Sequence, residues 1–250
     1  MLSSRIMKGG ALLNESRILV EQWDLSAEPS INLSRIVDEN LLAKKSTMRS
    51  HDVVSRVLSQ RFVEPGAHVI AALKQLTGHA RAFTEACYFE STRSDQLLAA
   101  FVEGPLWQWS TEGRIGVAVV DTESWLAKLA SNGELPDWSV EVRTRVARGL
   151  LAALRDFGVL KGATRKEFAT PSLSPSGFAY VAFRLREQGV VARGLTTSPV
   201  WRHWRLQADE IEHLFAETAH LGVLRKSQVG TVVRIDWELE SLVEVARAVA

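Results

Sequence analysis

The chain has 250 residues, of which 46% are hydrophobic and 24% charged, with 30 basic and 29 acidic side chains. This composition is that of an ordinary globular protein and excludes disordered, collagen-like and low-complexity classes. The longest apolar run covers residues 177–183, whereas a membrane-spanning helix needs about 20 residues, so we expect no membrane segment. The single cysteine, Cys87, cannot form an internal disulfide, and residues 1–10 lack the apolar stretch of a secretory signal. We therefore expect a cytoplasmic protein.

Apolar residues recur mainly at helical spacing, which predicts a mainly α protein. In the first half of the chain we expect helices over residues 11–23, 31–40, 48–62, 67–76, 80–89, 95–101 and 122–130. Ser46 and Thr47 can cap the third of these helices. We expect a break at residues 103–105, which contain Gly104 and Pro105. Periodicity leaves residues 115–120 open between a helix and a short strand.

Residues 131–136 (SNGELP) form the clearest linker, so we predict an N-terminal helical domain over 1–131 and a C-terminal one over 137–250. Further helices are expected over residues 137–157 capped by Asp137, 175–188 capped by Ser174, a short one from Ser198, and 209–220 with Asp209 and Glu212 as a capping box. Residues 231–237 alternate like a strand. Helix, glycine, strand, turn and strand is the order found at the end of a winged helix, although such a unit also occurs in proteins that bind no DNA.

The near-zero net charge conceals an uneven distribution of charged residues. Residues 35–61 carry six bases and three acids, residues 141–167 carry seven and three, and residues 184–205 carry five and one. Acidic residues gather instead over 209–217 and 236–244. Such segregation indicates a face that binds a polyanion. The alternative for each block is a solvated helix face whose charges are neutralised by neighbours in the fold.

The first candidate nucleic-acid site is a helix-turn-helix-like segment of the N-terminal domain. It consists of the helices over 31–40 and 48–62 with the turn between them, where a helix N-terminus favours phosphate. Its predicted contact residues are Lys44, Lys45, Ser46, Arg49, Arg56 and Gln60. Val54, Val57, Leu58 and Phe62 are predicted to face the core. A capped, solvated surface helix is the alternative. His51 is predicted to pack rather than to bind a ligand.

Two further candidate sites lie in the second half of the chain. The helix over 137–157 is predicted to bury Val142, Val146, Leu150, Ala153 and Leu154, and to present Arg145, Arg148 and Arg155, with Lys161, Arg165 and Lys166 after it. The predicted C-terminal hairpin adds Arg225, Lys226 and Arg234. All of these cations would act mainly by neutralising phosphates, which gives affinity with little sequence information.

Tryptophans suggest a site of another kind. Trp201, Arg202, Trp204 and Arg205 interleave aromatic and basic side chains, a combination that can stack on bases or form the centre of a protein interface. Trp107 and Trp109 could stack in the same way. With eight tryptophans in an otherwise ordinary composition, roles in the core or at a partner interface are favoured over stacking on bases.

Signatures of catalysis are absent from the sequence. We find no phosphate-binding loop, no dinucleotide-binding glycine pattern and no metal-binding His-Glu-x-x-His helix. The six histidines are scattered without ligand spacing, and Cys87 is predicted to pack as a small hydrophobe. We therefore expect no enzyme activity, no cofactor and no metal.

Five segments, taken in order, resemble the BrxA family of the BREX bacteriophage-defence systems. They are residues 8–17 (KGGALLNESR), 37–46 (VDENLLAKKS), 173–180 (LSPSGFAY), 221–224 (LGVL) and 234–237 (RIDW). The resemblance implies a small, mostly helical, non-enzymatic accessory protein that binds nucleic acid beside the methyltransferase and ATPases of the system.

The charge pattern and the resemblance together predict a mainly α protein in two parts that binds double-stranded DNA through basic helix faces. An RNA ligand is a variant of this hypothesis. The rival hypothesis is a protein-interaction scaffold that docks through Trp201 and Trp204, and it requires these side chains to be exposed.

Overall fold

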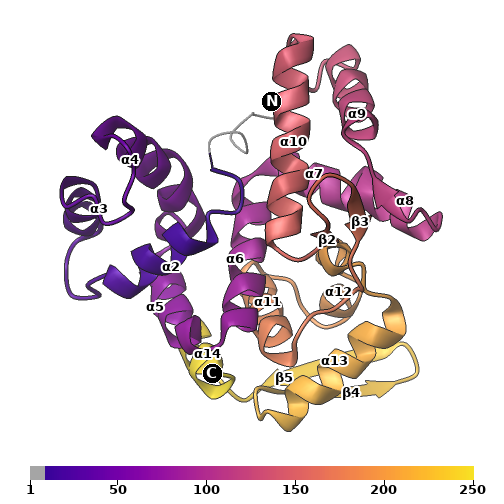
Figure 1. Cartoon of the computed structure of the whole chain (residues 1–250). Coiled ribbons are helices and arrows are strands. Elements are labelled where there is room, and N and C mark those ends of the chain that lie inside the picture. The colour runs from indigo at the N-terminus through magenta and orange to yellow at the C-terminus, as the bar shows by residue number, and fades with distance from the viewer. Residues whose placement is uncertain (1–8) are drawn as a thin grey trace.

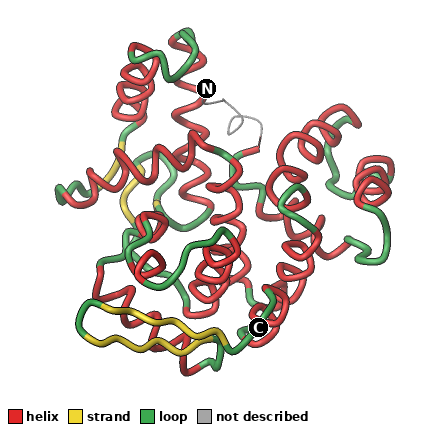
Figure 2. The backbone as a smooth tube through the Cα atoms, turned by 180° about the vertical axis from the view of Figure 1, so that it is seen from behind, coloured by secondary structure: helices red, strands yellow, loops and turns green. Residues whose placement is uncertain are grey.

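The computed structural model describes residues 9–250, and most of this part of the chain is helical, as the sequence predicts (Figures 1 and 2). The expectation of no secretory signal concerns residues 1–10, of which residues 1–8 lie outside the described residues. Before the 131–136 loop the elements are α2 (Leu13–Gln22), α3 (Pro29–Asp38), α4 (Thr47–Val53), the π-helical η1 (Val54–Val63), α5 (Ala67–Gln75), the 3-10 turn η2 (Leu76–Gly78), α6 (Ala80–Ser94), α7 (Gln96–Phe101), the π-helical η3 (Val102–Leu106), α8 (Trp107–Thr111), β1 (Gly116–Val117) and α9 (Val119–Ser131).

After this loop the chain alternates helices with short strands. The elements are α10 (Val140–Asp156), β2 (Leu160–Lys161), β3 (Lys166–Phe168), α11 (Pro175–Glu187), α12 (Arg193–Thr196), the 3-10 helix η4 (Pro199–Trp204), α13 (Ala208–His220), β4 (Leu224–Val229), β5 (Val232–Trp237) and α14 (Leu242–Ala248). Helix α10 stands at the top of the molecule in Figure 1, and the β4–β5 hairpin lies at the bottom.

The strands form two small antiparallel sheets. One has the order β1-β3-β2, so a strand from residues 116–117 joins a hairpin that lies about fifty residues later in the chain. The stretch 115–120, which periodicity left open, contains both the strand β1 and the start of helix α9. The other sheet is the two-stranded hairpin β4–β5, which confirms the predicted C-terminal strand.

The predicted break at residues 103–105 is wrong. The chain instead continues from α7 through η3 into α8, with Pro105 inside the helical path. Proline has no amide hydrogen to donate, and its ring clashes with the carbonyl four residues earlier in a regular α-helix. A π-helical turn is locally wider, because its hydrogen bonds span one residue more. The proline is therefore accommodated by a change of helix type.

Two of the predicted capping residues are confirmed, and two helices are capped by other residues than predicted. Ser46 caps α4 by accepting a hydrogen bond from the Arg49 amide (3.2 Å), and Ser174 caps α11 in the same way. The cap of α10 is Ser139, two residues after the predicted Asp137. The capping contact of α13 likewise uses Gln207 and Glu210 rather than Asp209 and Glu212. In both cases the helix begins on the polar residue that the fold leaves in an extended conformation (backbone ψ near 160°).

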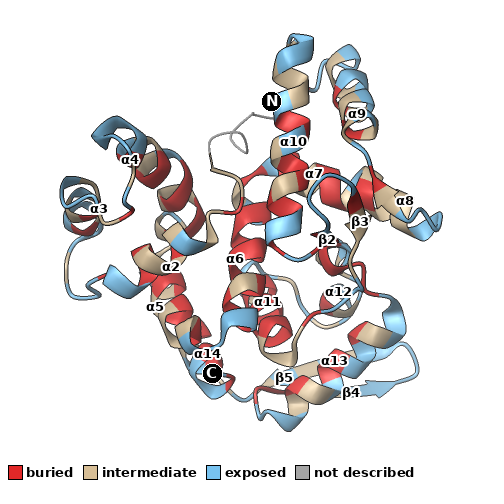
Figure 3. Ribbon diagram, in the orientation of Figure 1, coloured by how far each residue is buried: buried red, intermediate tan, exposed pale blue. Residues whose placement is uncertain are grey.

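A single cluster of buried apolar side chains runs through the described chain from Ala11 to Val249 (Figure 3). Helices α6 and α11 pack against each other within it, and α14 packs on α5 and α11. The C-terminal helix therefore lies beside helices from the first half (Figure 1). The loop over 131–136 joins α9 to α10, which pack together. The division into domains 1–131 and 137–250 stays a prediction.

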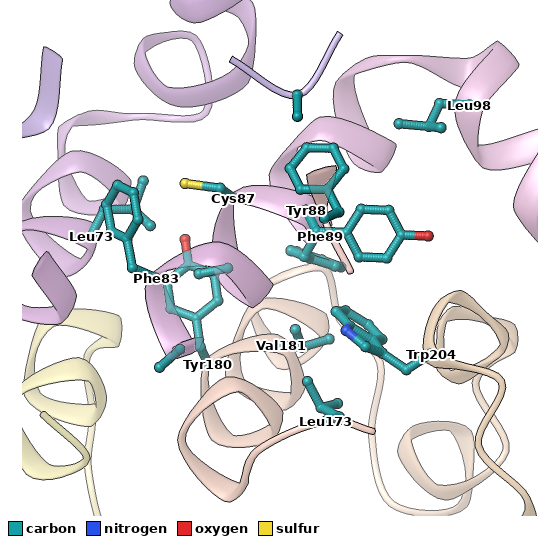
Figure 4. Packing of buried hydrophobic residues seen from close by; sticks show 14 of the residues in the cluster. Leu73, Phe83, Cys87, Tyr88, Phe89, Leu98, Leu173, Tyr180, Val181 and Trp204 are labelled. Carbon is teal, nitrogen blue, oxygen red and sulfur yellow. The ribbon is translucent and has the colours of Figure 1, made fainter. Parts of the chain in front are cut away.

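The centre of this cluster contains side chains that carry polar atoms (Figure 4). Cys87 is fully buried among apolar neighbours, which confirms its role as a small hydrophobe. The Glu90 carboxylate is also fully buried. It accepts hydrogen bonds from Arg184 Nε (2.7 Å), Tyr180 Oη (3.0 Å) and Arg93 Nε (2.7 Å). This network joins α6 to α11, and periodicity did not predict it.

Candidate nucleic-acid interface

Helix α10 carries a continuous exposed stripe. Arg145, Arg148 and Arg155 are all exposed, with Glu141 at one end of the stripe and the small Ala152 half-buried within it. The opposite face buries the apolar residues predicted for it, with Val142 half-buried at its start. A spacing of three or four residues places the stripe on one side of the helix. The predicted division of α10 into a core face and a basic face is confirmed.

The strands β2 and β3 form the second part of this site. We name residues 160–168, with the turn between these strands, the central hairpin. Lys161 and Arg165 are exposed on it, as predicted. Gly162 opens the turn with a φ of 89°, in the left-handed region that glycine adopts readily. A Cβ at Gly116 would lie 2.2 Å from the Lys166 carbonyl oxygen, so the close pairing of β1 with β3 requires glycine there.

The prediction that Lys166 contacts nucleic acid is wrong. Its side chain is only 9% exposed. Its Nζ donates hydrogen bonds to the carbonyl oxygens of Gly162 (2.9 Å) and Ala163. These carbonyls use two of the three donors of the ammonium, and the burial of the side chain keeps it turned away from a phosphate at the surface. Lys166 therefore holds the turn of the central hairpin together.

The exposed stripe and the central hairpin border one groove. Its volume is about 680 Å³, and its lining includes Arg148, Arg155 and Arg165 over an apolar floor with Val117 and Leu151. Sequence reasoning missed the part of β1 in this groove. The two residues of β1 are too few for a strand pattern, and their position depends on pairing with β3.

The first predicted site is only partly available. Ser46 is engaged as the cap of α4, and Lys44 is half-buried in an ion pair with Glu15. Lys45 and Arg49 are exposed at the start of α4.

The outer face of the helix beyond this point is mostly as predicted. Arg56 is exposed and pairs with Asp52 (3.0 Å), while Gln60 is half-buried. The four predicted core residues, Val54, Val57, Leu58 and Phe62, are buried. His51 is exposed, so its predicted packing role is wrong: it lies in the first turns of α4, which project from the body of the protein (Figure 3).

The cations of the C-terminal hairpin β4–β5 are paired within their own unit. Arg225 pairs with Glu238, and Lys226 pairs with Glu212 of α13. Arg234 pairs with Asp236 (2.9 Å). The surrounding residues 207–240 carry seven acidic and three basic side chains. The region around this hairpin therefore has a net formal charge of −4 (3 − 7), which disfavours the approach of phosphate.

The two tryptophans of the predicted site over residues 201–205 do not lie on the surface. Trp201 is 1% exposed, stacks on Phe178 with ring centroids 4.5 Å apart, and donates its indole N–H to the Leu195 carbonyl (2.6 Å). Trp204 is 6% exposed. These contacts place both rings in the core.

The two arginines of the same segment differ from each other. Arg205 is buried, whereas Arg202 is exposed with its guanidinium over the Trp107 ring. Trp201 and Trp204 are three residues apart and share one face of this 3-10 helix, but six residues repeat that face only twice, so burial here could not be read from the sequence. Stacking or docking through Trp201, Trp204 and Arg205 is therefore excluded by their burial.

Within residues 9–250 no helix combines the length and apolar character needed to cross a bilayer. The same residues hold no group of three or more histidine, cysteine, aspartate or glutamate side chains arranged to bind a metal ion.

Comparisons with known proteins agree with this architecture, a mainly helical protein with two small antiparallel sheets. The chain is similar to the crystal structure of an uncharacterized protein from Magnetospirillum magneticum, with a TM-score of 0.63 and 14% sequence identity. The match covers 81% of this chain and 97% of that chain, and at this identity it shows a shared fold alone. A search of curated proteins finds no match.

The family is shown by sequence. The BrxA family profile matches residues 2–185, which is more than half of the chain. The protein therefore belongs to the BrxA family and is a BREX-associated protein.

Proposed function

We propose that this protein is a non-enzymatic, cytoplasmic accessory factor of a BREX system that holds double-stranded DNA through α10 and the central hairpin. The observation that carries the proposal is the single groove bordered by Arg148 and Arg155 of α10 and by Arg165 of the hairpin. Clustered guanidinium groups on one face suit phosphate recognition, because each presents a planar set of donors.

The order of the elements supports the same use. A strand (β1), two packed helices (α9 and α10) and a hairpin (β2–β3) follow one another, and β3 lies between β1 and β2. The same order of elements occurs in winged helices, and in the related helix-turn-helix proteins the second helix enters the major groove of DNA. It supports the proposal that a DNA-binding unit lies here, earlier in the chain than the predicted C-terminal one.

The arginines of these elements can exchange their present carboxylate partners for phosphates. Arg155 pairs with the adjacent Asp156 (2.6 Å), and Arg165 lies 3.9 Å from Glu167, with all four side chains partly exposed. Exposed pairs of this kind contribute little to stability, so a phosphate can replace the carboxylate at small cost. In this proposal, other surfaces of the protein contact the methyltransferase and ATPases of the system.

The rival scaffold hypothesis loses its proposed site, since Trp201 and Trp204 are buried. Binding to RNA instead of DNA is one outcome of the test below, because basic helix faces neutralise the phosphates of both polymers.

The test is a titration of labelled duplex DNA and matched RNA with the purified protein at several salt concentrations. We expect affinity for the duplex to fall as salt rises. Replacing Arg145, Arg148 and Arg155 with glutamine should lower the salt slope by about 2.7, since each phosphate contact contributes about 0.9.

A second triple variant provides the matched control. Replacing Arg225, Lys226 and Arg234 with glutamine removes the same formal charge from the hairpin whose cations are paired internally. This variant should keep the slope of the parent protein. An equal loss of slope in both variants contradicts the assignment to α10, and no binding to either polymer at low salt removes the proposed function.

A further inference from the structure

A small pocket lies on the core side of the central hairpin, apart from the DNA groove. Its volume is about 270 Å³, and it is formed by the first turns of α6, the end of α10, the loop after β3 and the end of η4. The lining includes two guanidinium groups, two hydroxyl groups and two aromatic rings, which belong to Arg81, Arg205, Thr84, Ser172, Phe157 and Trp204.

Arg205 is a buried cation without a carboxylate at ion-pair distance among the described residues. It is 7% exposed, and Glu210, the carboxylate that acts on it from farther away, accepts a hydrogen bond from the Gln207 amide (2.7 Å). One terminal nitrogen donates to the Ala169 carbonyl, and the guanidinium lies over the Phe168 ring at 4.9 Å. Its Nε has no hydrogen-bond partner. Because a buried charge is costly unless it is paired and hydrogen-bonded, this arrangement indicates a missing anion.

The other buried cations of the described chain are satisfied. Arg61 donates to the carbonyls of Ala11 (2.9 Å) and Gly10 (2.7 Å), and Arg184 pairs with Glu90. Lys166 donates to two carbonyls of its own turn. Among these basic side chains, an unpartnered buried nitrogen occurs at Arg205 alone. This unpartnered nitrogen therefore belongs to a side chain that lines the pocket.

The carboxylate in the pocket wall does not supply this anion. Glu85 accepts hydrogen bonds from the Ser174 amide (2.9 Å), the Ser174 hydroxyl and Arg81 Nε (3.0 Å). Burial raises the pKa of Glu85 above its ordinary value, while the hydrogen bonds from Ser174 and Arg81 lower it. Arg81 also donates to the Ser172 hydroxyl and is more than half exposed. The pocket therefore keeps an excess of positive charge, with Arg205 inside and Arg81 at the more exposed edge.

We infer that this pocket binds a small organic oxyanion, a molecule with one carboxylate or phosphate group and a body no larger than one ring. The two guanidinium groups and two hydroxyls supply donors for the oxyanion, and Phe157 and Trp204 supply an apolar wall for its body. The volume lies just below the range of about 300–1,000 Å³ that drug-sized ligands occupy, which limits the ligand to this size. The inference does not depend on DNA binding.

The test is calorimetric titration of the full chain with benzoate and with inorganic phosphate, used separately at constant ionic strength. We expect saturable binding of at least one probe with a dissociation constant of about 1 mM or tighter. The probe that binds more tightly distinguishes a carboxylate ligand from a phosphate ligand.

Three variants locate the binding. Arg205→Met removes the buried cation and should abolish binding. Arg81→Gln changes an exposed residue, so it provides a folded variant in which affinity should fall severalfold even if Arg205→Met does not fold. Arg225→Gln, an exposed arginine of the C-terminal hairpin, is the control and should bind like the parent. No saturable binding of either probe up to about 10 mM, or equal binding in Arg81→Gln and the parent, overturns the inference.

Discussion

Replacing Lys166 with methionine tests whether this buried lysine organises the central hairpin. Methionine keeps an apolar stem of similar length but removes the ammonium that bonds the Gly162 and Ala163 carbonyls. Hydrogen bonds to a charged group contribute about 1.5–3 kcal/mol in favourable cases. Both carbonyls belong to exposed residues and can bond to water instead, so we expect a loss near the lower end, about 2 kcal/mol. For a chain of this size, that loss lowers the melting temperature by about 4–8 °C.

The neighbouring Arg165→Met is the matched control, because Arg165 is exposed on the same turn. It should leave the melting temperature unchanged and lower the salt slope of DNA binding by about 0.9. Thermal unfolding followed by circular dichroism, together with the DNA titration, measures both quantities. A melting temperature of Lys166→Met equal to that of the parent would refute the structural role of the ammonium.

Three further predictions concern the core. Trp201→Ala removes a fully buried ring and should lower the free energy of unfolding by about 3–5 kcal/mol. Urea denaturation measures this change. An unchanged denaturation midpoint would place the ring at the surface. Glu90→Gln should cost about 3 kcal/mol, the lower end for breaking a buried pair, because Arg184 loses its buried partner but keeps its pair with Glu187. Arg56→Gln on an exposed pair should cost less than about 1 kcal/mol. Burial raises the pKa of the Cys87 thiol, so a thiol reagent at pH 8 should label the protein only after denaturant is added, and labelling of the native protein contradicts the packing.

The helical class and many helix boundaries follow from local properties of the sequence. The hydroxyls of Ser46 and Ser174 each cap a helix by accepting from the amide three residues later, and the alternation along β5 reflects one exposed and one half-buried face. The basic face of α10 was predictable for a similar reason, because a helix of 17 residues repeats its core face several times.

Other features depended on contacts between distant parts of the chain. Strand β1 exists because residues 116–117 pair with residues 166–167. The exposed Arg165 and the buried Lys166 are adjacent and both basic, and only the carbonyls of the folded turn separate their roles. The sequence likewise could not show that Arg205 is buried with its Nε left without a hydrogen-bond partner.

The sequence by itself therefore determined which segments form helices and where basic residues gather, since both depend on neighbours within a few residues. The tertiary structure alone decided which of those bases face solvent, since burial depends on packing between segments far apart in the chain. Trp201 and Arg205 mark that difference. Each has a side chain suited to a binding surface, yet Trp201 stacks on Phe178 and Arg205 donates to the Ala169 carbonyl, contacts that no local pattern predicts.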